Sequence, residues 1–223
     1  MQNSNLTLLS EDKKIEIHTN SKYQDSCFND NFFFIVTEKS IIKIDTKTME
    51  YTEYERNYIS QSDNSKACMS LNSDTIVTAQ TMVTTSYVIA ENTLNGQYDK
   101  KVFTGMVLSI VPTNSNSFDV YIANTNNGTF STIDVISCTV QNDSAVIDAE
   151  SRGNITLNTK DETAYHSEFT KTKLDDSGFT LISPILDQFS VIMMHINSDN
   201  LSVDAMQTVN VGAGALSKTE LIE

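Results

Sequence analysis

The residues that could act as metal ligands, bases or nucleophiles are few and scattered along the chain. The histidines are His18, His166 and His195. None of them has a second His or Cys at the spacing of a metal site, and a general base also needs a positioned partner. We therefore predict that the histidines are neither metal ligands nor catalytic bases.

Four carboxylates recur at the same place in a repeated pattern, each at the end of a short apolar run. They are Asp45, Glu91, Asp134 and Asp204. One interpretation is a ring of carboxylates that binds a cation near one face of the fold. The interpretation we favour is structural, with each side chain capping a turn by accepting backbone N–H groups. The acidic segments 175–178 and 199–204 lack the ligand pattern of a calcium loop, so we predict solvated turns there.

Motifs that carry known chemistry are missing from the sequence. It contains no GxxxxGK[ST], GxGxxG or GxSxG, which are the usual phosphate, dinucleotide and serine-hydrolase signals. Cys27, Cys68 and Cys138 are odd in number, far apart and without a CxxC pair, which argues against a disulfide scaffold and a zinc site. We predict reduced, buried thiols, no cofactor and no enzymatic activity.

Composition narrows the class of partner. The 223 residues include 15 Lys and Arg against 29 Asp and Glu, a formal net charge of −14. Such a surface cannot neutralise many phosphates, so direct nucleic-acid binding is not expected. The N-terminus lacks the apolar core of a signal peptide, and no segment has the length and hydropathy of a membrane span. We expect an acidic intracellular protein, cytoplasmic or nuclear, that does not insert into a membrane.

The elements that would position these residues are short strands. The stretch 31–55 contains three runs of β-branched and aromatic residues separated by polar turns, which is a strand-and-hairpin pattern. Apolar runs start near Phe32, Thr75 and Phe118, so the spacing between successive starts is 43 residues. Each run has another short strand before it and two after it, and the last strand is the most polar. Four antiparallel strands every 40 to 45 residues is typical of a β-propeller blade.

We therefore predict an all-β, β-propeller-like array of about five four-stranded antiparallel blades, either incomplete or part of a longer protein. The expected domain covers residues 1–211, and residues 212–223 form a tail or linker. The blade-like units are expected near 20–58, 63–104, 106–142, 145–172 and 177–210.

The repeats resemble divergent WD-type propeller blades. The segment Val120-Tyr-Ile-Ala-Asn-Thr-Asn-Asn-Gly-Thr-Phe-Ser-Thr-Ile-Asp is also similar to the Tyr-Val-Thr-Asn class of propeller repeat. The resemblance covers residues 20–141 and, less closely, 179–206, although the Gly-His and Trp-Asp dipeptides of WD repeats are absent. It implies a platform that binds other proteins across its faces and rims, and it transfers no catalytic residue.

Three functional hypotheses follow. The first is a non-catalytic protein–protein interaction scaffold, a subunit of a larger intracellular assembly, with Tyr51, Tyr54 and Tyr58 as a candidate exposed partner-binding patch. Packing between neighbouring blades is the alternative role of these tyrosines. The second hypothesis is a structural protein of a virus or phage particle. The third is a propeller enzyme, a lyase or glycosidase with a central carboxylate site.

Overall fold

The computed structural model describes residues 4–9, 14–58, 67–82, 84–124, 129–141, 144–157, 165–166, 171–184 and 190–210. Every regular element in this part of the chain is a β-strand, which confirms the predicted all-β class. The expected tail at 212–223 lies outside the described residues. None of the described residues belongs to a helix long and apolar enough to cross a membrane.

Sixteen of the strands form four antiparallel sheets of four strands each, which we number in chain order. Sheet 1 contains β3 (Tyr23–Phe28), β4 (Phe32–Thr37), β5 (Ser40–Asp45) and β6 (Tyr51–Glu55). Sheet 2 contains β7 (Ala67–Ser70), β8 (Thr75–Met82), β9 (Thr85–Asn92) and β10 (Tyr98–Thr104). Sheet 3 contains β11 (Met106–Asn114), β12 (Ser117–Ala123), β14 (Thr132–Val140) and β15 (Ile147–Thr156). Sheet 4 contains β17 (Lys171–Asp175), β18 (Gly178–Pro184), β19 (Ser190–Asn197) and β20 (Val203–Asn210).

Two short ladders complete the described secondary structure. One pairs β1 (Ser4–Leu9) with β2 (Lys14–Thr19), and the other pairs β13 (Thr129–Phe130) with β16 (Tyr165–His166).

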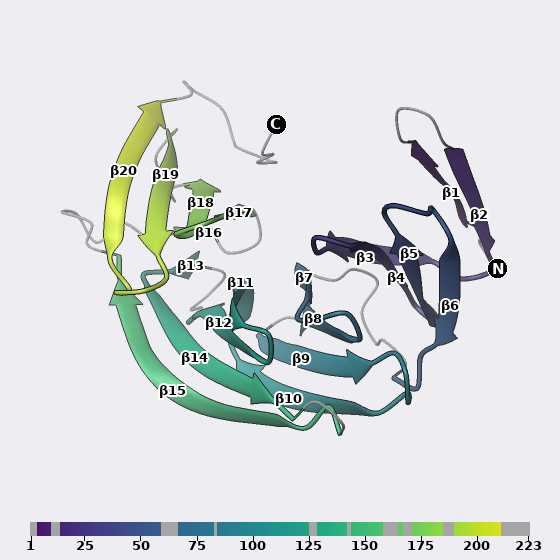
Figure 1. Cartoon of the computed structure of the whole chain (residues 1–223). Coiled ribbons are helices and arrows are strands. Elements are labelled where there is room, and N and C mark those ends of the chain that lie inside the picture. The colour runs from purple at the N-terminus through teal and green to yellow at the C-terminus, as the bar shows by residue number, and fades with distance from the viewer. Residues whose placement is uncertain are drawn as a thin grey trace.

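The sheets follow one another along an open arc (Figure 1). The first strands β3, β7, β11 and β17 lie on the inside, where each contacts the first strand of the neighbouring sheet, and β6, β10, β15 and β20 lie on the outside. The β1–β2 hairpin stands at one end of the arc and sheet 4 at the other, and no described strand lies between these two ends. The array is therefore an open propeller.

In sheets 1 to 3 both faces of the middle strands are buried, because each of these sheets packs between two neighbouring elements. In β8, Ile76 belongs to the core shared with sheet 1, whereas Val77 and Ala79 belong to the core shared with sheet 3. The same alternation places Phe34 against sheet 2 and Ile35 against β2. This explains why these strands appear in the sequence as continuous apolar runs.

The expected blade boundaries need one correction, in the second half of the chain. Residues 145–172 do not form a four-stranded unit within the described part of the chain, because β15 is the fourth strand of sheet 3. Sheet 3 is larger than its expected bounds because β14 and β15 run to 9 and 10 residues.

Candidate interaction surface on sheet 4

Asparagine and aspartate side chains shape the hairpin turns of all four sheets. Asp45 Oδ1 accepts the N–H groups of Lys47 and Thr48, both at 2.8 Å. These two hydrogen bonds lower the pKa of Asp45 below its ordinary value, and the bond from Thr48 has the larger effect. The residues that accept backbone N–H groups in the same way elsewhere are Asn29, Asn72, Asn92, Asn114, Asp175 and Asn197.

Two of these asparagines also join neighbouring sheets at the period of the repeat. Asn29 Nδ2 donates to Ser70 Oγ at 2.8 Å and lies 3.5 Å from the carbonyl oxygen of Asn72, 43 residues further on. Asn72 Nδ2 donates to the carbonyl oxygen of Ser115 at 3.1 Å, again 43 residues further on. The side chain that caps one turn therefore also holds the corresponding turn of the next sheet.

Glu91 does not cap a turn. The last residue of β9 is Asn92, which occupies the position of Asp45 in sheet 1. The predicted alignment was wrong by one residue, and such a slip moves a strand side chain to the opposite face. Glu91 instead faces sheet 1, where Arg56 Nε contacts both carboxylate oxygens at 3.0 Å.

The Arg56–Glu91 pair is a buried bridge between sheets 1 and 2. The side chains are 0% and 6% exposed. Arg56 Nη1 also donates to Gln24 Oε1 at 2.9 Å and to the carbonyl oxygen of Thr37 at 2.7 Å. Burial raises the pKa of Glu91, and the hydrogen bonds from Arg56 oppose this rise.

The remaining two recurring carboxylates also differ from the expected turn caps. Asp134 lies inside β14, opposite Ile122 on one side and Asn154 on the other. Asp204 accepts hydrogen bonds from the side chains of Asn197 and Ser202 rather than from backbone N–H groups. In the described part of the chain, no three His, Cys, Asp or Glu side chains are grouped so that they could hold a metal ion.

The three tyrosines do not form one exposed patch. Tyr51 is 49% exposed and Tyr54 is half-buried, but Tyr58 is only 7% exposed. Its ring lies 5.7 Å from that of Tyr98 and 5.8 Å from the Arg56 guanidinium, so Tyr58 packs at the boundary of sheets 1 and 2. Tyr51 and Tyr54 are three residues apart on one strand and so point to opposite faces.

One cluster contains Ser, His and Asp without the arrangement of a catalytic triad. His195 Nε2 lies 3.0 Å from Ser177 Oγ, and Nδ1 lies 3.3 Å from Asp175 Oδ2. In a triad the imidazole separates the serine from the aspartate. Here Ser177 Oγ is already 2.9 Å from Asp175 Oδ1, because both residues belong to the same turn. The side chain of His166 is outside the described residues.

The two ends of the arc differ in how their sheet faces are covered. At the β1–β2 end, Ile17 packs on Ile35, Ile42 and Ile44 of sheet 1, and all four are at most 2% exposed. On sheet 4, one face packs on sheet 3, whereas the other carries Met193 and Val209, which are 36% and 47% exposed. We call this second face the open face; its paired residues are Val191 with Val209, Met193 with Gln207, and His195 with Ala205.

The outermost strand of sheet 4 has an unusual composition for an edge. The other outermost strands carry charges along their length: Glu53 and Glu55 on β6, Asp99, Lys100 and Lys101 on β10, and Asp148, Glu150 and Arg152 on β15. On β20 the only charged residue is Asp204, near its start, and residues 205–210 are uncharged. Among the described strands, β20 pairs with β19 alone. Charged side chains are the usual protection of a sheet edge against pairing, and β20 lacks them.

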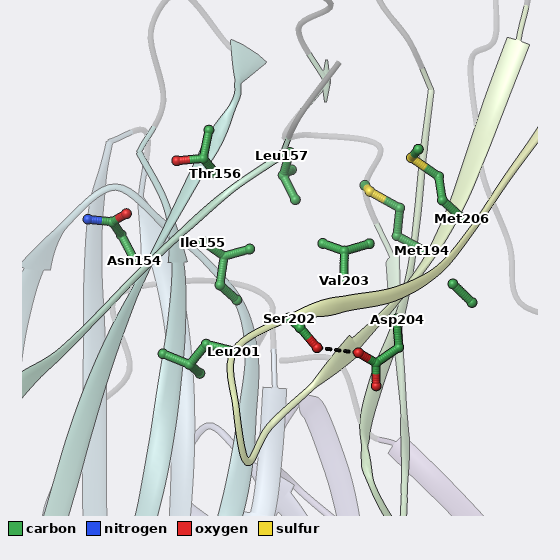
Figure 2. Close-up of a pocket in the computed structure, with 11 residues that line it drawn as sticks. Asn154, Ile155, Thr156, Leu157, Met194, Leu201, Ser202, Val203, Asp204 and Met206 are labelled. Atoms are coloured by element: carbon green, nitrogen blue, oxygen red, sulfur yellow. Dashed lines mark hydrogen bonds between the residues drawn. The ribbon is translucent and has the colours of Figure 1, made fainter. Parts of the chain in front are cut away.

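A groove of about 540 Å³ lies between β20 and the end of β15. Figure 2 shows Ile155 and Leu157 on one side, Met194 and Met206 on the other, and Val203 between them. The side chains of Asn154, Ser202 and Asp204 supply polar groups at the groove. Met206 is 57% exposed, so an apolar surface continues from the groove onto β20. The lack of charge on β20 is visible in the sequence and could have indicated this surface. The pattern of strands did not show that one face of sheet 4 is open.

These features define an open β-propeller array whose last sheet has one face that no other described strand covers. The sequence matches none of the protein families with which it was compared, and no curated protein matches it. Its structure is similar to that of apo AztD from Citrobacter koseri, with a TM-score of 0.51 and 8% sequence identity over 88% of this chain and 50% of that one. The chain thus spans about half the length of AztD, and at this identity the likeness is one of fold alone.

Two further solved structures match with lower TM-scores. Kluyveromyces lactis Hsv2 has a TM-score of 0.37 at 10% identity, covering 90% of this chain and 75% of that one. The N-terminal domain of Nup159 has a TM-score of 0.25 at 12% identity, covering 88% and 64%. These neighbours and AztD are β-propellers. The assignment to the WD type remains a prediction.

Proposed function

We propose that the chain is a non-catalytic interaction module that binds an extended segment of a partner protein along the outer edge of β20. The observation that supports this function is the character of β20, an exposed outermost strand whose residues 205–210 carry no charge. An edge of this kind offers its backbone N–H and C=O groups to an added strand.

The two faces of β20 would recognise alternate side chains of the added segment. Because strand side chains alternate, one set would lie toward the groove beside Met194 and Met206, and the other would extend the open face beside Val209. Backbone pairing supplies affinity in this mode, and the groove supplies selectivity for a bulky apolar side chain.

Charge favours a basic partner segment. The chain has a net charge of −14, and Asp204 lies in the wall of the groove. Asp204 accepts hydrogen bonds from Ser202 and Asn197, which lower its pKa, and the bond from Ser202 has the larger effect. Its carboxylate is therefore ionised at neutral pH. We therefore expect the partner segment to carry Lys or Arg beside its apolar residues. The same charge disfavours a nucleic-acid partner.

The experiment uses the full-length protein expressed in its native cells, with a photo-crosslinking amino acid at Gln207 on β20 or, as the control, at Thr52 on β6. Both positions are exposed on outermost strands. We expect one stoichiometric partner to crosslink from Gln207 and not from Thr52. Val209→Lys should reduce this capture at least about tenfold, because a charge on the edge opposes strand addition.

Val102→Lys is the matched control, since Val102 is 55% exposed on β10, where charged neighbours are already present. Equal capture from Gln207 and Thr52, or capture that Val209→Lys leaves unchanged, would contradict the proposal. Crosslinks from Gln207 to further copies of the same chain would favour the structural-particle hypothesis instead.

A further inference from the structure

Two cysteine sulfurs meet between the inner strands of sheets 1 and 2. Cys27 on β3 and Cys68 on β7 are 41 residues apart in the sequence, and their Sγ atoms lie 2.8 Å apart. Non-bonded carbon atoms, which are smaller than sulfur, pack at about 3.5–4.0 Å. The S–S bond of a disulfide is about 2.05 Å, so less than about 1 Å of movement separates this contact from a bond.

The backbone around the pair is held at this spacing by an independent contact. Two residues after each cysteine, Asn29 Nδ2 donates to Ser70 Oγ at 2.8 Å. Both side chains point into the small core between the sheets, which is formed by Phe34, Val36, Ile41 and Ile76 together with Cys27, with Cys68 packed against it. The sulfurs are thus brought together by strand packing and not by one flexible side chain.

The surroundings favour a covalent pair over other uses of two thiols. No third metal-ligating side chain joins them within the described residues. Burial raises the pKa of Cys68 well above its ordinary value, and the adjacent Cys27 adds to this, so the reactive thiolate is scarce at neutral pH. Because Cys27 is buried and Cys68 is only partly exposed, a bond between them would exchange slowly with other thiols once formed.

We propose that Cys27 and Cys68 form a disulfide that joins sheets 1 and 2. The oxidant is a low-molecular-weight disulfide such as oxidised glutathione. The thiolate of Cys68, the less buried of the two, attacks it, forms a mixed disulfide and releases one glutathione thiolate. Cys27 then loses its proton and attacks the Cys68 sulfur, which forms the Cys27–Cys68 bond and releases the second glutathione. The two protein thiols lose two protons and two electrons, and one oxidised glutathione becomes two reduced molecules.

This assignment departs from the sequence-based expectation of three reduced thiols. The odd number of cysteines and their wide spacing gave no sign of this pair in the sequence. Cys27 and Cys68 occupy similar places in consecutive repeats and become neighbours only when the sheets stack. Cys138 remains a free thiol, 1% exposed in the core of sheets 2 and 3, and burial raises its pKa to about 12.

The test equilibrates the purified full-length protein with oxidised or reduced glutathione, unfolds it in denaturant, and counts free thiols by alkylation and mass spectrometry. We expect one alkylated cysteine, Cys138, in the oxidised sample and three in the reduced sample, with a peptide pair joined through Cys27 and Cys68. The melting temperature of the oxidised form should exceed that of the reduced form by about 5–15 °C.

Two variants sharpen the test. Cys138→Ser should keep the joined peptides and the shift in melting temperature, whereas Cys27→Ala/Cys68→Ala should lose both. Three alkylated cysteines in the oxidised wild-type protein would overturn the proposal, as would a bond to Cys138 or a glutathione adduct that persists on Cys68. The wild-type thiol count decides the question even if a variant fails to fold.

Discussion

At the scale of single residues, asparagine takes the turn positions that glycine occupies in many β proteins. The chain has 7 glycines, and its turns are closed instead by Asn and Asp side chains that accept the N–H groups two and three residues ahead. Asn72 has a second role that an aspartate could not fill, because its Nδ2 donates to the Ser115 carbonyl of the next sheet. One residue type therefore sets both the turn and the spacing between sheets.

This dual role predicts a measurable difference between two asparagines. Asn72→Ala should lower the free energy of unfolding by about 1–2 kcal/mol, because it removes both the turn acceptor and the link between sheets. Asn114→Ala should lower the free energy of unfolding by only about 0.5–1 kcal/mol, because Asn114 Oδ1 accepts the Asn116 N–H within its own turn. Urea denaturation of both variants measures the difference. Equal losses would mean that the Asn72–Ser115 contact contributes nothing.

At the scale of elements, sheets 1 and 2 are held together by polar contacts as well as by packing. Lys43 Nζ on β5 lies 3.0 Å from Asp74 Oδ1, just before β8, and Arg56 reaches from the end of β6 to Glu91 on β9. Lys43 and Asp74 remain partly exposed, so their pair contributes little. The Arg56–Glu91 pair is buried, and removing one partner leaves an uncompensated charge.

Arg56→Met should therefore destabilise the protein by about 3–5 kcal/mol near pH 8. The pKa of Glu91, already raised by burial, should rise further without its guanidinium partner. A carboxyl whose folded pKa exceeds its unfolded value binds more protons in the folded state, so the variant loses stability as pH rises from its unfolded pKa through the folded one. The deficit relative to wild type should thus be smaller at pH 5 than at pH 8, as measured by urea denaturation at both values.

The double variant Arg56→Met/Glu91→Gln is the matched control. Its stability should lack the fall between pH 5 and pH 8 that Glu91 causes in Arg56→Met, because the amide that replaces the Glu91 carboxylate does not titrate. A deficit in Arg56→Met that is constant with pH would show that Glu91 escapes to solvent in the variant, contrary to this account.

At the scale of the whole molecule, the open arc makes stability depend on position. Each sheet contacts mainly its neighbours, as in a repeat protein, so interior sheets gain two interfaces and sheet 4 gains one. Sheet 3 shares one apolar core with sheet 2 and another with sheet 4. Sheet 4 leaves its open face and β20 exposed.

Hydrogen exchange monitored by mass spectrometry should reveal this gradient. We expect the amides of β12 (Ser117–Ala123) to exchange at least about a hundredfold more slowly than those of β20 (Val203–Asn210), which corresponds to about 2.8 kcal/mol of opening free energy. Comparable protection of β20 in the isolated protein would show that another segment already covers it. Protection of β20 that appears only with a bound partner would support the proposed function.

The sequence alone determined the local features. Runs such as Phe32–Val36, the 43-residue period and the Asn and Asp turns predicted four-stranded antiparallel units, because strand propensity and turn chemistry act between residues close in the chain. The tertiary structure decided which face each side chain occupies. It placed Glu91 against Arg56, buried Tyr58, assigned β15 to sheet 3 and brought Cys27 to Cys68. These outcomes depend on strand register and on the stacking of sheets about 40 residues apart in the sequence. A shift of one residue in register moves every side chain of a strand to the opposite face.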